Sequence, residues 1–266
     1  MARTEDTIEI MLERPLYGGY CLGRRNGKAV MVPYAIPGET VAAIITEERT
    51  DYCFAAIASI IHEDPRRRVA DCPHFTRCGG CSYLHVPYDR ELEFKKTILE
   101  ESLTRIAGLS RGDIPETAVI HDDRYGYRSH ATIKAREGIP GFYRKGTNDF
   151  VPVGESGCLL LAAPLNAWMR DSVSIPEDCR IAVDSSFNVI SSLQGDAVVV
   201  DTAANLVFAR AISCFFQANR FLRDRMLETV RNYAGTGRNG TFLDIGCGVG
   251  SSPWRWPAIR NPGRGL

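Results

Sequence analysis

The chain has 266 residues, 44% hydrophobic and 24% charged, which are the proportions of a soluble globular protein with room for about two domains. Lysine and arginine total 32, as do aspartate and glutamate, so bulk positive charge is excluded as the means of holding a polyanion. No apolar run approaches the roughly 20 residues of a membrane helix, and MARTEDTIEI lacks the apolar core of a signal peptide, so we expect a cytoplasmic protein without a membrane partner.

Five short apolar segments follow one another between residues 5 and 62, at roughly ten-residue spacing. Turns such as RNGK and AIPGE separate the segments TIEIMLERP, GYCLGRR, KAVMVP, TVAAIITEE and YCFAAIASII. The pattern predicts a small closed β-barrel of the OB type, a shape often used to bind single-stranded nucleic acid. A barrel with a structural or protein-binding role would show the same pattern. The linker after it carries three arginines, 66–68, which could meet phosphates or form a solvated linker.

The segment CPHFTRCGGCSYLH places Cys72, Cys78 and Cys81 within ten residues on a glycine-rich loop. The chain has nine cysteines, and an odd number argues against a complete disulfide framework. Clustered thiolates repel one another unless a cation neutralises them, so the segment predicts either zinc or an iron–sulfur cluster. His74 or His85 could complete a zinc site, whereas a cubane cluster favours a fourth thiolate from farther along the chain. Reduced, buried cysteines without a metal are the alternative.

Residues 89–108 have apolar side chains at helical spacing and predict an amphipathic helix with Asp89 as its N-cap. The apolar positions are Leu92, Leu99, Leu103 and Ile106. Three strand-like segments, IAVDSS, AVVVDT and LVFAR, come later in the chain, and a second helix is expected from Ala218 to Tyr233.

Residues 126–153 predict a β-hairpin, GYRSHATIKAR followed by GIPGFYRKGTNDFVPV, in which basic and aromatic side chains are interleaved. This mixture can hold phosphates and stack on bases, although exposed strands often carry lysine and arginine for solubility alone. The candidate RNA contacts are Arg128, Lys134, Arg144 and Lys145.

The segment TFLDIGCGVG is an apolar strand that runs into a glycine turn. Glycines permit positive φ and close approach of the backbone to a ligand. A dinucleotide fingerprint requires G-x-G-x-x-G, but Ser251 stands where its third glycine would fall. The form D-x-G-x-G-x-G, beginning at Asp244, is common in methyltransferases that use S-adenosylmethionine (SAM). An ordinary glycine turn is the alternative.

Taken in order, these segments resemble the RNA uracil-5 (m5U) methyltransferases, specifically the iron–sulfur branch with an N-terminal TRAM domain that methylates ribosomal RNA or, in some lineages, tRNA. The matching strings cover nearly the whole chain: GGYCLGR, VPYAIPGE, CPHFTRCGGC, YRSHATIKA, GFYRKGTNDFVPV, SCFFQAN and LDIGCGVG. The resemblance implies a multidomain α+β fold. An OB-like TRAM barrel would occupy residues 1–63, and a central α/β iron–sulfur domain with an antiparallel sheet residues 64–208. A Rossmann-like SAM domain would begin within residues 209–266.

The resemblance also implies ligands. A 4Fe–4S cluster would be held by Cys72, Cys78, Cys81 and Cys158, with zinc as the runner-up. The SAM site would include Gln217, Asp244, Gly246, Gly248 and Ser251, although Gly246 and Ser251 differ from the aromatic and Asn-like residues often found there. The RNA is expected to be ribosomal, because the bacterial tRNA branch typically lacks both barrel and cluster, with tRNA as the alternative. The protein is expected to be a monomer.

In the family, a cysteine thiolate adds to uracil C6, the enolate takes the methyl group from SAM, and a base removes the C5 proton. The nucleophile and base lie in late segments that this sequence does not match, so no catalytic residue is assigned and Cys247 is taken as part of the cofactor loop.

The ending SPWRWPAIRNPGRGL is unfavourable to a helix, and its codons read in another frame encode LALAR, a good match to the helix that the family has at this point. We therefore expect a frameshift near residues 251–253 and a truncated, inactive methyltransferase. The alternatives are a non-catalytic RNA-binding iron–sulfur module and a zinc-binding RNA protein.

Overall fold

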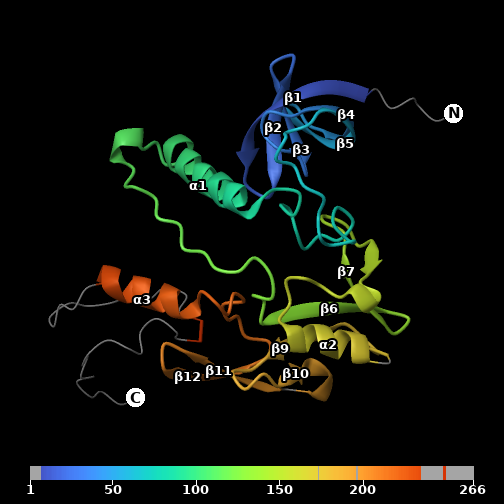
Figure 1. Ribbon diagram of the computed structural model, residues 1–266, viewed down its shortest axis with the longest axis vertical. Coiled ribbons are helices and arrows are strands. Elements are labelled where there is room, and N and C mark those ends of the chain that lie inside the picture. The colour runs from blue at the N-terminus through green and yellow to red at the C-terminus, as the bar shows by residue number, and fades with distance from the viewer. Residues whose placement is uncertain (1–6, 173, 196, 235–247, 250–266) are drawn as a thin grey trace. The chain divides into compact units, whose positions relative to one another are not determined.

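The computed structural model describes residues 7–172, 174–195, 197–234 and 248–249 and divides into two compact units (Figure 1). The first unit comprises Met1–Val119 and Tyr143–Val151, and the second comprises Ile120–Phe142 and Pro152–Leu266. None of the helices in the described part of the chain combines the length and apolar character that a bilayer crossing requires. The predicted domain boundaries at residues 63 and 208 stay predictions.

The first unit begins with a closed five-stranded barrel in the order β1-β2-β3-β5-β4, as predicted. Its strands are β1 (Thr7–Leu16), β2 (Tyr20–Arg25), β3 (Lys28–Pro33), β4 (Thr40–Glu48) and β5 (Tyr52–His62). β3 and β5 pair in parallel, and the other neighbours pair in antiparallel fashion. Each strand lies within a residue or so of its predicted segment, because alternating apolar positions and turn residues are both local features of the sequence.

The barrel core follows the alternation of β1. Ile8, Ile10 and Leu12 are buried, whereas the residues between them are exposed. They pack with valines and alanines of the other strands. Gly23 on β2 is required by this packing, because a Cβ atom there would lie 2.6 Å from Cδ1 of Ile10 and 2.8 Å from a backbone oxygen of β1.

The long helix of the first unit, α1 (Tyr88–Arg105), confirms the predicted helix but not its details. Its N-cap is Pro87, so the prediction of Asp89 as N-cap is wrong. Asp89 lies in the first turn, where its carboxylate complements the helix dipole. The predicted apolar stripe is only partly covered: Leu92 and Leu103 are half-buried, whereas Leu99 and Ile106 are 48% and 86% exposed. The buried apolar residue of the helix is Phe94, which the prediction did not include.

An antiparallel sheet in the order β10-β9-β6-β7-β8 contains the predicted hairpin. Its strands are β6 (His130–Arg136), β7 (Ile139–Tyr143), β8 (Phe150–Pro152), β9 (Cys179–Val183) and β10 (Val189–Ser191). The hairpin turns at Glu137 and Gly138, which both have positive φ, as a two-residue turn of the primed type requires. The helix α2 (Ala163–Asp171) packs Leu165 and Met169 into the core of this unit.

A two-stranded sheet, β11 (Val198–Ala203) and β12 (Leu206–Ala211), and the helix α3 (Arg223–Ala234) follow. The second predicted helix therefore begins five residues later than expected. The stretch before α3 bonds to another part of the chain: Ala218 O accepts from Ser129 N, and Arg220 N donates to Tyr127 O. Three short 3-10 helices complete the secondary structure: η1 (Arg111–Asp113), η2 (Gly154–Ser156) and η3 (Ser192–Gln194).

Candidate functional site

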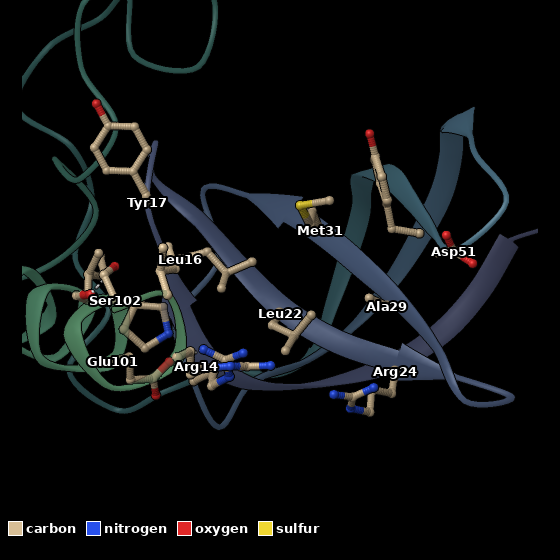
Figure 2. A pocket seen from close by; sticks show the side chains of 15 residues that line it. Arg14, Leu16, Tyr17, Leu22, Arg24, Ala29, Met31, Asp51, Glu101 and Ser102 are labelled. Carbon is tan, nitrogen blue, oxygen red and sulfur yellow. Dashed lines mark hydrogen bonds and ion pairs between the residues drawn. The ribbon is translucent and has the colours of Figure 1, made fainter. Parts of the chain in front are cut away.

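A groove of about 510 Å³ lies between the outer face of the barrel and the last turns of α1 (Figure 2). We call it the barrel groove. Its floor is formed by Leu22 of β2 and by Ala29 and Met31 of β3. The other lining residues are Arg14, Pro15, Leu16, Tyr17, Arg24, Asp51, Tyr52, Ile98, Glu101, Ser102, Arg105 and Ile106. An ion pair between Arg14 and Glu101 joins β1 to the helix beside the groove.

The cysteine loop, residues 72–81, is held against the tip of the 143–151 segment within the first unit. Gly79 N donates to Tyr143 O at 2.9 Å, and Cys78 N donates to His74 O at 2.8 Å. A Cβ atom on Gly79 would lie 2.7 Å from the backbone nitrogen of Lys145, so this position accepts only glycine without a shift of the backbone.

The three cysteines of this loop are half-buried. Burial and then the thiol of Cys78 raise the pKa of Tyr34, and Cys81 adds to the shift, so two of the thiols act on one phenol. Within the described ranges, however, no three His, Cys, Asp or Glu side chains form a group that could hold a metal ion. The backbone nitrogen of Cys158, in the second unit, donates to Oδ1 of Asn166 at 2.8 Å. The metal site stays a prediction.

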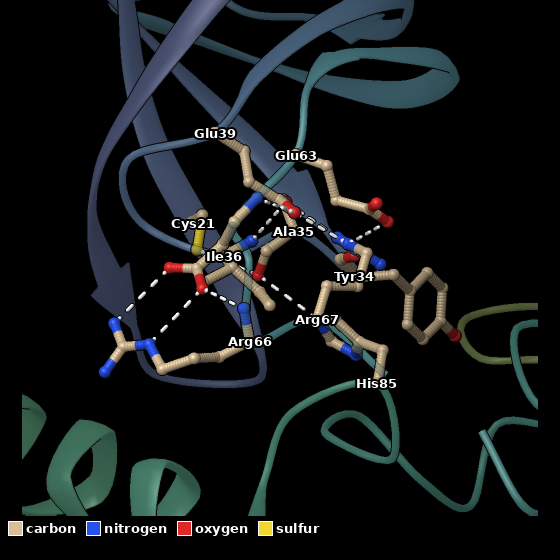
Figure 3. Close-up of polar contacts among 10 residues, drawn as sticks. Cys21, Tyr34, Ala35, Ile36, Glu39, Glu63, Arg66, Arg67 and His85 are labelled. Atoms are coloured by element: carbon tan, nitrogen blue, oxygen red, sulfur yellow. Dashed lines mark hydrogen bonds and ion pairs between the residues drawn. The ribbon is translucent and has the colours of Figure 1, made fainter. Parts of the chain in front are cut away.

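The loop between β3 and β4 is fixed by a buried ion pair that the sequence analysis missed (Figure 3). Glu39, fully buried, accepts from Nε and Nη2 of Arg67 at 2.6 and 2.7 Å and from the backbone nitrogen of Ile36 at 2.8 Å. Arg67 also donates to Tyr34 O at 3.0 Å. Its two neighbours pair with acids instead, Arg66 with Asp64 and Arg68 with Asp71. The middle arginine of this run therefore has a structural role.

The four candidate RNA contacts fall in both units. In the first unit, Nζ of Lys145 donates to Gly18 O and lies 4.4 Å above the ring of Tyr20, and burial lowers its pKa. Arg144 is exposed and lies 4.0 Å from Asp149. In the second unit, Nζ of Lys134 pairs with Asp178 at 2.8 Å, and the backbone of Arg128 bridges Leu161 and Asn219. Lys145 and Lys134 thus have partners within their own units. RNA contact by any of the four stays a prediction.

Gln217, the glutamine predicted to contact SAM, lines a pocket of about 330 Å³ beside α3. The other lining residues are Ile120, Asn219, Leu222, Arg223, Met226, Thr229 and Val230. Gly248 has φ of 59°, a conformation that glycine adopts without strain, and Val249 packs against a cluster that includes Phe208 and Phe216. A role of Gly248 in SAM binding stays a prediction. The predicted positions Asp244, Gly246 and Ser251 lie outside the described residues.

A buried ion network holds the backbone at Gln217. Nε of Arg223 donates to Gln217 O at 2.9 Å, and its Nη1 pairs at 2.8 Å with Asp201, which is fully buried. Nε of Arg210 pairs with the other oxygen of Asp201 at 2.9 Å. Both guanidinium groups lie over the ring of Phe216, at 4.6 Å for Arg223 and 5.1 Å for Arg210.

The sequence held one indication of this network. Asp201 lies two residues from Val199 and from Ala203 in β11, so its side chain is on the same buried side of the strand as theirs. A buried carboxylate requires a partner.

Nearby, burial lowers the pKa of His130 to about 4, with further contributions from Arg210, Arg223 and Arg128. His130 is therefore neutral at physiological pH.

Comparison with known proteins gives three kinds of similarity. The TRAM domain family model matches residues 4–58, which include most of the barrel. A relative in Aquifex aeolicus named uncharacterized RNA methyltransferase is 37% identical over 163 residues, covering 60% of this chain and 37% of the relative. One of the same name in Leptospira interrogans is 30% identical, covering 87% of this chain and 60% of the relative.

Two further proteins have specific names. The 23S rRNA (uracil(1939)-C(5))-methyltransferase RlmD of Pseudomonas entomophila is 31% identical, covering 60% of this chain and 36% of the relative. The crystal structure of Pyrococcus abyssi tRNA (uracil-54, C5)-methyltransferase in complex with S-adenosyl-L-homocysteine matches with a TM-score of 0.56 at 15% identity, covering 83% of this chain and 64% of that chain. The latter likeness shows the fold alone.

The chain spans between about a third and three fifths of the length of these curated relatives. The similarity nevertheless runs through both compact units, because the Leptospira alignment covers 87% of the chain. The chain therefore carries a match to the TRAM domain and is similar in sequence to proteins named RNA methyltransferase.

Proposed function

We propose that this chain is part of an enzyme that methylates C5 of uracil in RNA with SAM as methyl donor. The observation that carries the proposal is the placement of Gln217 on an apolar pocket, with its backbone fixed by Arg223. The uracil specificity rests on the resemblance and on the name of the Pseudomonas relative. The RNA is ribosomal in this proposal, and tRNA is the alternative that the assay below includes.

The described residues would bind and orient SAM rather than perform the chemistry. The apolar pocket would hold the cofactor, and Gln217 would donate and accept hydrogen bonds through its amide. Arg223 and Ser129 fix the carbonyls of residues 217 and 218, so the amide is presented from a rigid backbone. When bound, SAM supplies an electrophilic methyl group. Carbon C5 of uracil is a weak nucleophile, and in the family a cysteine thiolate activates it by adding to C6. No residue here is assigned that role.

A 4Fe–4S cluster on Cys72, Cys78, Cys81 and Cys158 is the second part of the proposal. The donor set fits chemically, because four thiolates are the usual ligands of such a cluster. The arrangement does not fit as it stands, because no metal-holding group of three is formed among the residues that the structure describes. No step of the reaction is derived through the cluster. Iron and sulfide analysis after anaerobic purification checks it, and stoichiometric zinc without iron would contradict it.

Methyl transfer tests the main proposal. Tritiated SAM is incubated with the protein and with unmodified 23S rRNA or tRNA transcripts, and the modified base is identified by mass spectrometry. The proposal expects this chain to bind SAM and Gln217→Ala to weaken that binding. 5-Methyluridine is expected only when the nucleophile and base, for which no residue here is assigned, are also supplied. RNA binding without SAM binding would contradict it and would instead support a non-catalytic RNA-binding module.

A further inference from the structure

We propose that the barrel groove binds a short unpaired stretch of the RNA, with one base stacked on the side chain of Tyr17 and another on that of Tyr52. The inference rests on the proposed function, because it takes the occupant to be the same RNA. It goes beyond that function by assigning these bases to a specific surface. That surface involves none of the four candidate contacts of the sequence analysis.

The floor of the groove is unusually apolar for the outside of a barrel. Leu22 pairs with Met31 across β2 and β3, and Arg24 pairs with Ala29, so these side chains share one face. Leu22 is buried although it is not part of the barrel core. In barrels of the OB type, the face of strands 2 and 3 together with the loops after strands 1 and 4 binds oligonucleotides. Here the same strands and both corresponding turns line the groove.

Two aromatic rings stand at the groove where a base could stack. Tyr17, in the turn between β1 and β2, is 88% exposed (Figure 2). Tyr52, at the start of β5, is 38% exposed and pairs with Ala29 at the other end of the groove floor. The ring of Tyr52 also lies edge-on to Phe54, with centroids 5.8 Å apart, which orients it. Each base stacked on an aromatic side chain contributes about 1–3 kcal/mol to single-stranded binding, whereas a fully exposed tyrosine ring contributes little to folding.

The charges favour RNA over an apolar peptide. Three arginines and two acids line the groove, but Glu101 is neutralised by Arg14. Arg24 is half-exposed, with Nε 3.7 Å from Glu13, and Arg105 is exposed at the end of α1. Flexible cations at the rim of an aromatic groove are the arrangement by which proteins hold the phosphates of a single strand.

The helix α1 lies beside the outer face of β2 and β3 and limits the size of the groove there. Ile98 and Ile106 form its wall, and Ile106 is otherwise 86% exposed. The volume of about 510 Å³ is at the lower to middle range of small-ligand sites, about 300–1,000 Å³. A flat OB face would accept a long run of bases in succession, whereas a groove closed on one side by a helix accepts a short stretch.

The test measures binding of a fluorescent single-stranded, uridine-rich RNA by anisotropy. Tyr17→Ala and Tyr52→Ala are each expected to weaken binding about 5- to 150-fold, the ratio that corresponds to one lost stacking interaction. Tyr17→Phe should retain binding, because the ring is kept. Tyr233→Ala is the matched control, since Tyr233 is also 88% exposed but lies on α3.

A salt titration gives a second readout. Arg24→Gln should reduce the slope of log binding constant against log salt by about 0.7, as expected for one lost phosphate contact on a single strand. Equal affinity of wild type, Tyr17→Ala and Tyr52→Ala would overturn the inference. Tyrosine-dependent RNA binding without SAM binding would contradict the proposed function and leave the groove standing, and absence of RNA binding by the wild type would contradict both.

Discussion

At the scale of single residues, Asp201 has the largest consequence for stability. It is fully buried and is the carboxylate partner of both Arg210 and Arg223. Buried ion pairs are strongly destabilised when one partner is removed, because the remaining charge is left without compensation. The pocket at Gln217 depends on the same network, since Arg223 bonds to its backbone carbonyl.

We therefore predict that Asp201→Asn lowers the free energy of unfolding by about 3–5 kcal/mol. Urea denaturation followed by circular dichroism measures the change. Asp149→Asn is the control, because Asp149 is exposed and 4.0 Å from Arg144, and it should change stability by less than about 0.5 kcal/mol. Similar effects of the two substitutions would show that the network adds nothing to stability.

His130 predicts how stability depends on pH. Burial and then Arg210 lower its pKa from 6.5 to about 4 in the folded protein. Between pH 6.5 and 4 the unfolded state binds more protons at this residue than the folded state, so its contribution to stability is complete above pH 6.5 and is lost as pH falls.

His130→Gln should therefore flatten the acid limb of the stability profile. The difference between wild type and variant is expected to be at most about 1.4 kcal/mol per pH unit in that window, and smaller because the ring is partly solvated. Urea melts at several pH values between 4 and 7 give both slopes. Parallel profiles would mean that His130 titrates alike in the folded and unfolded chains.

At the scale of elements, the cysteine loop depends on one of its two adjacent glycines. A Cβ atom on Gly79 would meet the backbone of Tyr143 and Lys145 at 2.7–2.9 Å, whereas one on Gly80 would meet only Sγ of Cys78 at an ordinary 3.6 Å. Gly79→Ala should thus cost about 1–3 kcal/mol through backbone displacement, and Gly80→Ala should be well tolerated. Hydrogen exchange of the 72–81 and 143–147 segments, read by mass spectrometry, measures the effect. Equal protection in the two variants would show that the loop and the tip are not packed as described.

The secondary structure could be predicted where local patterns determine it. The five barrel strands and the 126–153 hairpin were predicted closely because side-chain alternation and turn residues lie within each segment. The start of α3 was wrong by five residues because the carbonyl of Ala218 bonds to Ser129, which lies far back in the chain. A helical pattern cannot reveal a competing partner at that sequence distance.

The sites were predictable to a smaller extent. Gln217 came from a short string within a resemblance, and the structure places it on a pocket. The pair of Glu39 and Arg67 and the barrel groove were missed, because each joins residues from separate elements. The sequence of residues 66–68 does not show that the middle arginine is largely buried and its two neighbours are not. Residues 89–108 were predicted as an amphipathic helix without a stated partner, and in the structure Ile106 of its apolar positions lines the groove.

At the scale of the whole molecule, the ion pair of Glu39 and Arg67 predicts where the barrel ends as a folding unit. The TRAM match ends at residue 58 and β5 ends at His62, but the partner of the buried Glu39 comes later, at Arg67. A barrel cut after β5 would keep every strand and lose this arginine. Glu39 would then be a buried carboxylate that keeps the backbone nitrogen of Ile36 as a donor but loses both Arg67 and the backbone nitrogen of Asp64.

A fragment of residues 1–70 should therefore be more stable than one of residues 1–62, by about 3–5 kcal/mol, the cost of removing one partner of a buried pair. Thermal melts followed by circular dichroism measure the difference. Arg67→Met in the longer fragment should reproduce the loss, and Arg66→Ala should not, because the Arg66 side chain is half-exposed and pairs at the surface. If both fragments melted together, the additional eight residues would be only a linker, and the pair of Glu39 and Arg67 would not contribute to the stability of the barrel. A loss seen with Arg67→Met but not with Arg66→Ala would instead place the end of the barrel domain after Arg67, beyond its last strand.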